Sequence, residues 1–375
     1  MNRPFEQDIR ELLDVPVNRL VAEAQASGAK AIGYTCSYVP EPLIGVAGLV
    51  PVRLRAPGVA GTPLADTYLS SVICPYTRSL LEFALDGKLE PLDGWVHTGS
   101  CDHLRRFYDN LDYLVKPDFN HMIDLPHKMG AEALQWFADE LKQLALGLER
   151  HFGVEVGDQQ LSDAINTHNQ CVDLLTSIGE LRKSNAPSIT GTDFHTLVTA
   201  SSVSPKKGMI KRIEKIKAAL TGSQEIPKHR ARLMLAGSQL DDPGYIGVIE
   251  SMGGLVVADR LCFGTISGLD RIELTSDPIT ALARHYLTKA SCPRMMENFR
   301  DRVKTLIATA KEYRVDGIVV QVMKFCDCWG VEANPLVKAL RDAGLPVLRV
   351  EREYALTGEE QLKTRIQAFL ESIGK

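Results

Sequence analysis

The sequence of 375 residues lacks most of the signals that mark specialised classes of protein. It has no apolar run close to the ~18 residues that a membrane span needs, and no basic tail or stripe typical of nucleic-acid binding. Aromatic residues make up only 6%, and the net charge is −4. The polar, amphipathic start MNRPFEQDIRELL is unlike a signal peptide. We therefore expect a cytoplasmic protein of enzyme size, with no membrane and no nucleic acid among its partners.

Two nucleotide-binding motifs are also missing. No GxxxxGK[ST] loop occurs, so we do not expect this chain to hydrolyse ATP. No GxGxxG follows a predicted strand, so a dinucleotide site has no support. The chain has no CxxC pair either, which disfavours the usual zinc knuckle.

The pattern of apolar residues predicts an α/β protein. In residues 1–128, an N-terminal helix is followed by alternating strands and helices, as expected for a parallel sheet with crossovers. Residues 129–228 are mainly helical, and the alternation resumes in residues 229–375. We predict two Rossmann/flavodoxin-like parallel-sheet domains with a helical region between them. Among the finer predictions are a helix at 40–48 that starts near Pro40 and another at 334–344.

The eight cysteines are scattered along the chain, which argues against a disulfide framework in a reducing cytosol. Taken singly, a cysteine is most often a small buried apolar residue, and we interpret Cys171 in this way. Cys36, Cys101 and Cys326 differ because each follows a predicted strand. Ligands of parallel α/β sheets bind at the carboxyl ends of the strands, so these three thiols can converge. Cys262 follows the run LVVADRL and Cys292 precedes Pro293 at a predicted helix start, and we do not count these two among the converging thiols.

Three converging thiolates without a set of histidines favour an iron–sulfur cluster or zinc. Single cysteines from several loops suit a [4Fe–4S] cube, in which three ligands leave one iron open to an oxygen. The alternative, that these cysteines only fill the core, stays open on spacing alone. For the CxC pair, both thiols can approach one cluster, which makes Cys328 a cofactor-binding candidate. We prefer the interpretation that Cys328 packs while Cys326 faces the cluster, with Trp329 as a lid or core residue.

Several motifs together resemble the 2-hydroxyacyl-CoA dehydratase and benzoyl-CoA reductase family, and within it the smaller iron–sulfur subunit of the reductase. They occur in the family's order over nearly the whole chain, and as a set they are specific. The motifs are CSYVPEPL at 36–43, CPYTRSLLE at 74–82, SCDHLRRFYD at 100–109, LPHK at 125–128, RLMLAGSQLDDP at 232–243, KFCDCWGVE at 324–332 and TRIQAFLE at 364–371.

The resemblance implies a [4Fe–4S] cluster whose ligands are Cys36, Cys101 and Cys326, the same three cysteines that the strand ends indicate. It also makes Cys74 a pocket residue or an alternative ligand.

Three further residues follow as catalytic candidates. Ser37 can hydrogen-bond an oxygen on the open iron, or cap the strand. His103 can donate a proton or order the surroundings of the cluster, or bond to the backbone. Glu41 is a weaker acid–base candidate, because a first-turn glutamate also suits the helix dipole.

The resemblance further implies partners. These are a homologous cluster-bearing subunit, a CoA-thioester substrate, and a separate iron–sulfur ATPase of the acetate kinase/actin-like type as electron donor. We favour dearomatising reduction of benzoyl-CoA, because the third cysteine is followed by DCWGVE and not by a proline–acidic run. Radical dehydration of an (R)-2-hydroxyacyl-CoA is the alternative. A non-catalytic relay or scaffold subunit, and a relative with a double-cubane cluster that needs more ligands, stay open.

Overall fold

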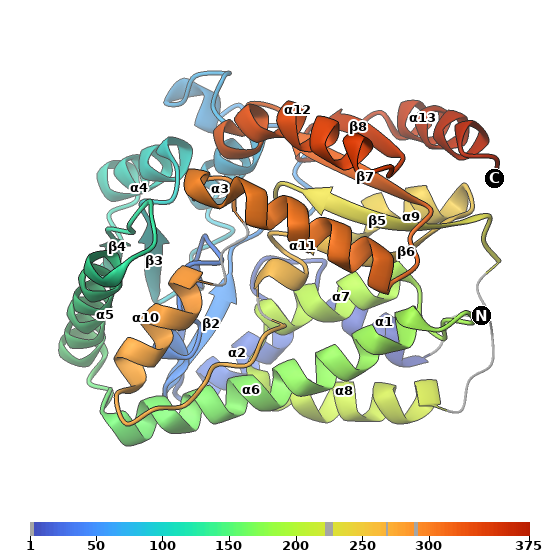
Figure 1. Cartoon of the computed structure of the whole chain (residues 1–375). Coiled ribbons are helices and arrows are strands. Elements are labelled where there is room, and N and C mark those ends of the chain that lie inside the picture. The colour runs from blue at the N-terminus through green and yellow to red at the C-terminus, as the bar shows by residue number, and fades with distance from the viewer. Residues whose placement is uncertain (1–3, 222–227, 268, 289–291) are drawn as a thin grey trace.

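The computed structural model describes residues 4–221, 228–267, 269–288 and 292–375. They form two parallel four-stranded sheets surrounded by helices (Figure 1). This arrangement confirms the predicted fold class. The strands of the first sheet are β1 (Lys30–Tyr34), β2 (Leu49–Arg53), β3 (Gly94–Thr98) and β4 (Asn120–Ile123). Those of the second are β5 (Ala231–Gly237), β6 (Gly254–Leu261), β7 (Gly317–Met323) and β8 (Val347–Arg352).

The two sheets have the same strand order. It is β2-β1-β3-β4 in the first and β6-β5-β7-β8 in the second, and every neighbouring pair is parallel. In each sheet the chain steps to one edge and then returns past the first strand to the other side. The order therefore reverses between β1 and β3, and again between β5 and β7. Such switch points leave a crevice at the carboxyl ends of the strands, where ligands bind.

Helices cover both faces of each sheet. The α-helices are α1 (Pro4–Glu11), α2 (Arg19–Ala26), α3 (Pro75–Leu85), α4 (Asp102–Leu114), α5 (Ala131–Phe152), α6 (Asp158–Glu180), α7 (Gly191–Ser202), α8 (Lys206–Thr221), α9 (Pro243–Ser251), α10 (Pro278–Thr288), α11 (Phe299–Glu312), α12 (Asp327–Asp342) and α13 (Glu359–Ser372). Short 3₁₀ turns are η1 (Leu43–Gly45), η2 (Ala65–Thr67), η3 (Leu181–Lys183), η4 (Thr265–Ser267) and η5 (Met296–Asn298). Within the described part of the chain, no helix is both long and apolar enough to cross a bilayer.

Local sequence explains several of these helices. The side chain of Asn18 accepts hydrogen bonds from the first turn of α2, and Thr190 does the same for α7. Helix α5 carries apolar residues along one face and ends at Gly153, whose φ of 67° suits glycine.

One helix prediction is wrong, and another places the start of its helix too late. Residues 40–48 form only the single turn η1, because the two prolines, Pro40 and Pro42, leave too few backbone donors for a continuous α-helix. Helix α12 begins at Asp327, directly after Cys326, and not at residue 334. Aspartate in the first turn favours this start, and Pro335 lies inside the helix.

The packing crosses the predicted segment boundaries. Leu282 on α10 and Phe137 on α5 share one core cluster with Ile32 of β1, and Figure 1 shows α10 beside α5. Near the N-terminus of the chain, Ile9 on α1 packs in a cluster with residues of α7 and α8. A helix from the last third of the chain thus covers the first sheet. The division into 1–128, 129–228 and 229–375 remains a prediction.

Candidate functional site

The carboxyl ends of the two sheets border one cavity of about 110 Å³. This volume is several times the ~10–15 Å³ that one water molecule needs. Residues from both halves of the chain line it, and seven of the eight cysteines are among them: Cys36, Cys74, Cys101, Cys262, Cys292, Cys326 and Cys328. Cys171 is buried elsewhere, in the helical core.

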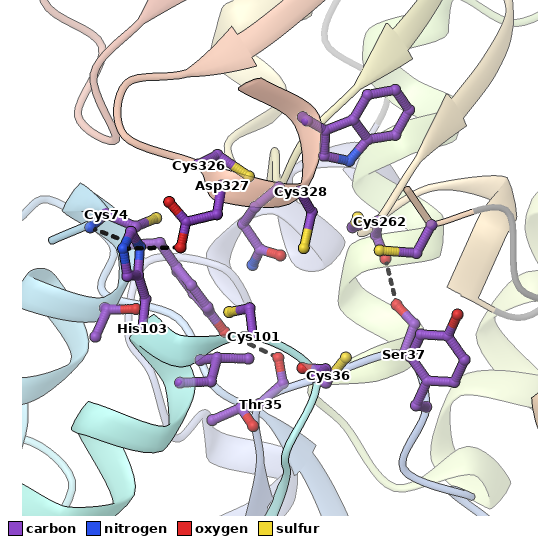
Figure 2. Close-up of a pocket in the computed structure, with 18 of the residues that line it drawn as sticks. Thr35, Cys36, Ser37, Cys74, Cys101, His103, Cys262, Cys326, Asp327 and Cys328 are labelled. Atoms are coloured by element: carbon purple, nitrogen blue, oxygen red, sulfur yellow. Dashed lines mark hydrogen bonds and ion pairs between the residues drawn. The ribbon is translucent and has the colours of Figure 1, made fainter. Parts of the chain in front are cut away.

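The cysteines predicted from the strand ends lie at the two switch points. Cys36 follows β1, Cys101 follows β3, and Cys326 follows β7. The fold therefore brings these three residues, distant in sequence, to one cavity. Figure 2 shows Cys36 and Cys101 on one side of this space and Cys326 on the opposite side.

Three of the cavity cysteines begin helices. Cys74, Cys101 and Cys326 are the N-cap residues of α3, α4 and α12. Unpaired N–H groups and the positive end of the helix dipole favour negative charge at such positions. Burial raises the pKa of the Cys101 and Cys326 thiols well above the usual range, while first-turn N–H groups of Leu104 and Trp329 oppose this rise. In this apolar setting a stable thiolate requires a cationic partner.

Cys74 lies in the cavity wall, as expected of a pocket residue. Its Sγ is 3.5 Å from Sδ of Met323, and burial raises the pKa of its thiol. Its backbone N–H donates to Nδ1 of His103 at 3.1 Å. The pocket position of Cys74 is thus a feature of the structure, and its role as a ligand stays a prediction.

Cys328 does not simply pack in the core, which was the preferred interpretation of the CxC pair. It lies in the first turn of α12 and faces the cavity (Figure 2), which Cys292 also lines. The interaction between the two thiols lowers the pKa of the Cys292 thiol and raises the pKa of the Cys328 thiol.

Sequence reasoning set aside two cavity residues, Cys262 and Cys292. Cys262 follows β6, so it carried the same strand-end signal as the chosen cysteines. Burial raises the pKa of its thiol to about 12. Cys292 had no such signal, because a long connection between β6 and α11 brings it to the cavity.

Ser37 joins the two halves of the site. Its hydroxyl donates to the backbone carbonyl of Cys262 at 2.9 Å (Figure 2). The hydroxyl therefore links the end of β1 to the end of β6. Because its proton is used in this bond, the oxygen of Ser37 can accept a hydrogen bond as it stands, but it can donate one only by turning away from Cys262.

His103 lies between three helix starts. Its Nδ1 accepts the N–H of Cys74, and its Nε2 is 3.2 Å from a carboxylate oxygen of Asp327. Since Nδ1 accepts, Nε2 carries the proton and donates it to Asp327. The imidazole thus ties α4 to the starts of α3 and α12, which carry Cys74 and Cys326 (Figure 2).

The structure does not bring Glu41 into the cavity. The chain turns after Cys36, and the Glu41 carboxylate is buried 2.5 Å from the Tyr34 hydroxyl and 3.1 Å from Nζ of Lys206. Burial alone would raise the pKa of this carboxyl, but Lys206, with His168 and Tyr34, brings it well below the usual range. Glu41 is therefore a charge held inside the fold and does not line the cavity.

The donor set of the cavity fits an iron–sulfur cluster. Its metal-binding side chains are mainly thiols, and N-terminal helix ends surround them. Within the described ranges, no three His, Cys, Asp or Glu side chains are placed to share a single metal ion. A cube binds each thiolate at a separate corner, so its ligands stand farther apart than those of one ion.

Comparisons with known proteins give a consistent result. The sequence model of the family described as 2-hydroxyglutaryl-CoA dehydratase, D-component, matches residues 36–373. The chain is 24% identical over 372 residues to the (R)-phenyllactyl-CoA dehydratase beta subunit of Clostridium sporogenes, covering 98% of each chain. It is 25% identical to the (R)-2-hydroxyglutaryl-CoA dehydratase subunit beta of Acidaminococcus fermentans, covering 94% of this chain and 95% of that one. It is 23% identical to a benzoyl-CoA reductase subunit of Thauera aromatica, covering 97% and 95%.

Proposed function

We propose that this chain, which belongs to the 2-hydroxyglutaryl-CoA dehydratase D-component family, is the [4Fe–4S]-bearing subunit of a larger enzyme. That enzyme would act on a CoA thioester with single low-potential electrons. The observation that carries the proposal is the shared cavity of Cys36, Cys101 and Cys326. These three thiolates would hold three corners of the cube and leave the fourth iron open. The named relatives are subunits of larger enzymes, which supports a homologous partner subunit in the cytoplasm.

When bound, such a cluster supplies single electrons and an open iron that can bind an oxygen. The protein supplies the surroundings. Helix N-termini beside Cys74, Cys101 and Cys326 stabilise the negative charge of a thiolate-ligated group. His103 holds the helix starts in register, and Ser37 presents an oxygen at the cavity wall.

For the reaction itself, we favour dearomatising reduction of benzoyl-CoA or a close analogue. Two electrons and two protons then convert the aromatic ring to a cyclic dienoyl-CoA. The run DCWGVE after Cys326 supports this branch, and the similarity to a benzoyl-CoA reductase subunit is consistent with it. A separate iron–sulfur ATPase of the acetate kinase/actin-like type would deliver the electrons, since this sequence has no GxxxxGK[ST] loop.

Dehydration of an (R)-2-hydroxyacyl-CoA is the alternative, and the dehydratase relatives support it to the same degree. In that reaction water leaves and the electron is recycled, so no net reductant is consumed.

A further candidate is a reductase of small molecules with a double-cubane cluster, or a relay subunit that passes electrons to its partner. The observation that favours the double-cubane cluster is the presence of Cys262, Cys292 and Cys328 in the same cavity. Three additional thiols would supply the ligands that a second cube needs.

The test is an anaerobic assay of the chain with its co-purified subunits, ATP and a strong reductant. We expect benzoyl-CoA to be consumed with net oxidation of the reductant. Consumption of a 2-hydroxyacyl-CoA without net oxidation would select the dehydratase. Consumption of neither thioester would refute both and support the double-cubane or relay candidate. Cys101→Ala should abolish the activity, whereas the matched control Cys171→Ala, outside the cavity, should retain it.

A further inference from the structure

Arg53 is a buried cation without a counter-charge. It ends β2, and only 1% of its surface is exposed. Its Nε has no hydrogen-bond partner, and no carboxylate of the described residues forms an ion pair with the guanidinium. The group rests on the ring of Phe263, with Cζ 4.0 Å from the centroid. An aromatic face attracts a cation but does not replace an anion.

The other buried arginines show how unusual this is. Arg55 pairs with Asp241, Arg182 with Asp259, and Arg302 with Glu332. Arg294 donates to three backbone carbonyls, and Arg352 donates to the side chain of Gln321 and to backbone carbonyls. Each of these five has oxygen acceptors, and Arg53 has none within the described residues. Removing an arginine from water without an acceptor is strongly unfavourable, so the arrangement calls for an anion that the chain itself does not provide.

The position of Arg53 indicates where that anion belongs. Its side chain lines the cavity together with Cys36, Cys262 and Cys292. It is also close enough to Cys262 to lower the pKa of that thiol against the effect of burial. A cube held by three thiolates carries net negative charge, and one-electron reduction adds another negative charge.

We infer that Arg53 is the fixed counter-cation of the iron–sulfur group in this cavity and sets its reduction potential. The inference rests on the proposed function, because it requires a cluster at the cysteines. Arg53 is a positioning residue here, since it acts on the cluster through its charge and is not a ligand. A neighbouring positive charge stabilises the more negative, reduced state, so Arg53 raises the potential. At an effective dielectric of about 20, a single charge roughly 10 Å away changes the equilibrium between the oxidised and reduced states on the order of tenfold.

The inference is tested with three full-length variants, each compared without iron and after anaerobic reconstitution. Arg53→Met removes the charge and keeps an apolar side chain in the same place. Arg53→Lys keeps the charge. The matched control is Arg55→Met, in which the lost arginine has an acidic partner inside the fold. The readouts are iron per chain, the thermal midpoint, and the reduction potential from a dye-coupled titration followed by electron paramagnetic resonance.

We expect the effect of Arg53→Met on the thermal midpoint to depend on whether the cluster is bound. Without iron, Arg53→Met removes an uncompensated charge and should raise the midpoint by about 2–4 °C. With the cluster loaded, that gain should disappear. The loaded variant should be reduced about tenfold less at a fixed potential, which corresponds to about 59 mV for one electron. Arg53→Lys should stay close to the wild type, and Arg55→Met should be destabilised in both states.

Two results would overturn the inference. One is a loaded Arg53→Met protein with the wild-type potential, and the other is a loss of stability without iron like that of Arg55→Met. If wild-type protein takes up no iron at all, the proposed function fails first, and the two failures are thus distinguishable.

Discussion

Replacement of His103 by alanine tests how the three helix starts are held together. The imidazole accepts the buried N–H of Cys74 and donates to Asp327. Leaving that N–H without an acceptor costs about 1–3 kcal/mol. The Asp327 side chain is 57% exposed, so its ion pair adds at most about 1 kcal/mol. Loss of the packed ring adds about 1 kcal/mol. We therefore expect His103→Ala to lower the free energy of unfolding by about 2–5 kcal/mol.

The assay is thermal unfolding of the iron-free protein. At ~2.1 cal/mol/K per residue, the unfolding entropy of a chain of 375 residues is about 0.8 kcal/mol/K, so the midpoint should fall by about 3–6 °C. His103→Asn is the matched control, because its amide oxygen can take the place of Nδ1 and accept the Cys74 N–H. It should cost only about 1 kcal/mol. Equal losses of stability in the two variants, or no loss in His103→Ala, would refute the idea that His103 holds the three helix starts together.

Three further changes test other parts of the fold. The pKa of Glu41 lies below its usual range, so the ionised carboxylate stabilises the fold above the usual carboxyl pKa of about 4.3, and this stabilisation is lost as the pH falls below that value. Glu41→Gln should therefore reduce the loss of stability that the protein shows on acidification. An unchanged loss would exclude Glu41 as its source. Phe325 has a φ of 58° and is 49% exposed, so Phe325→Gly should stabilise by about 1 kcal/mol, measured by denaturant unfolding; a loss would show that the ring makes contacts that matter more. Leu282→Ala on α10 should cost about 2–5 kcal/mol if α10 is part of the core of the first sheet, and a loss below about 1 kcal/mol would argue against that packing.

The fold class was predictable because strands and helices differ in apolar period, and the strands of both sheets lie in the segments 1–128 and 229–375 where alternating strands and helices were expected. The start of the helix after Cys326 was harder to predict. The helix was expected to start at residue 334, whereas the observed start at Asp327 depends on how the chain leaves β7. The turn at 43–45 was missed because its apolar residues imitate an amphipathic helix between prolines.

The candidate site was predictable only where the signal was local. Cys36, Cys101 and Cys326 each follow a strand, and parallel topology brings such positions together. Cys292 reaches the same cavity through tertiary packing that periodicity does not contain, whereas Arg53 ends β2 and so lies at the same edge of its sheet as the chosen cysteines. Glu41 shows the converse, because it is close to Cys36 in sequence but its side chain is held by Lys206 in the interior.

The most direct test of the central claim is the iron and acid-labile sulfide content of the anaerobically reconstituted chain. The wild type should bind at least about four irons with an equal amount of sulfide, as one cube requires. The triple variant Cys36→Ser, Cys101→Ser, Cys326→Ser should lose that cube, while Cys171→Ser should keep it. Equal iron in the wild type and the triple variant would contradict the assignment of these three thiolates as ligands.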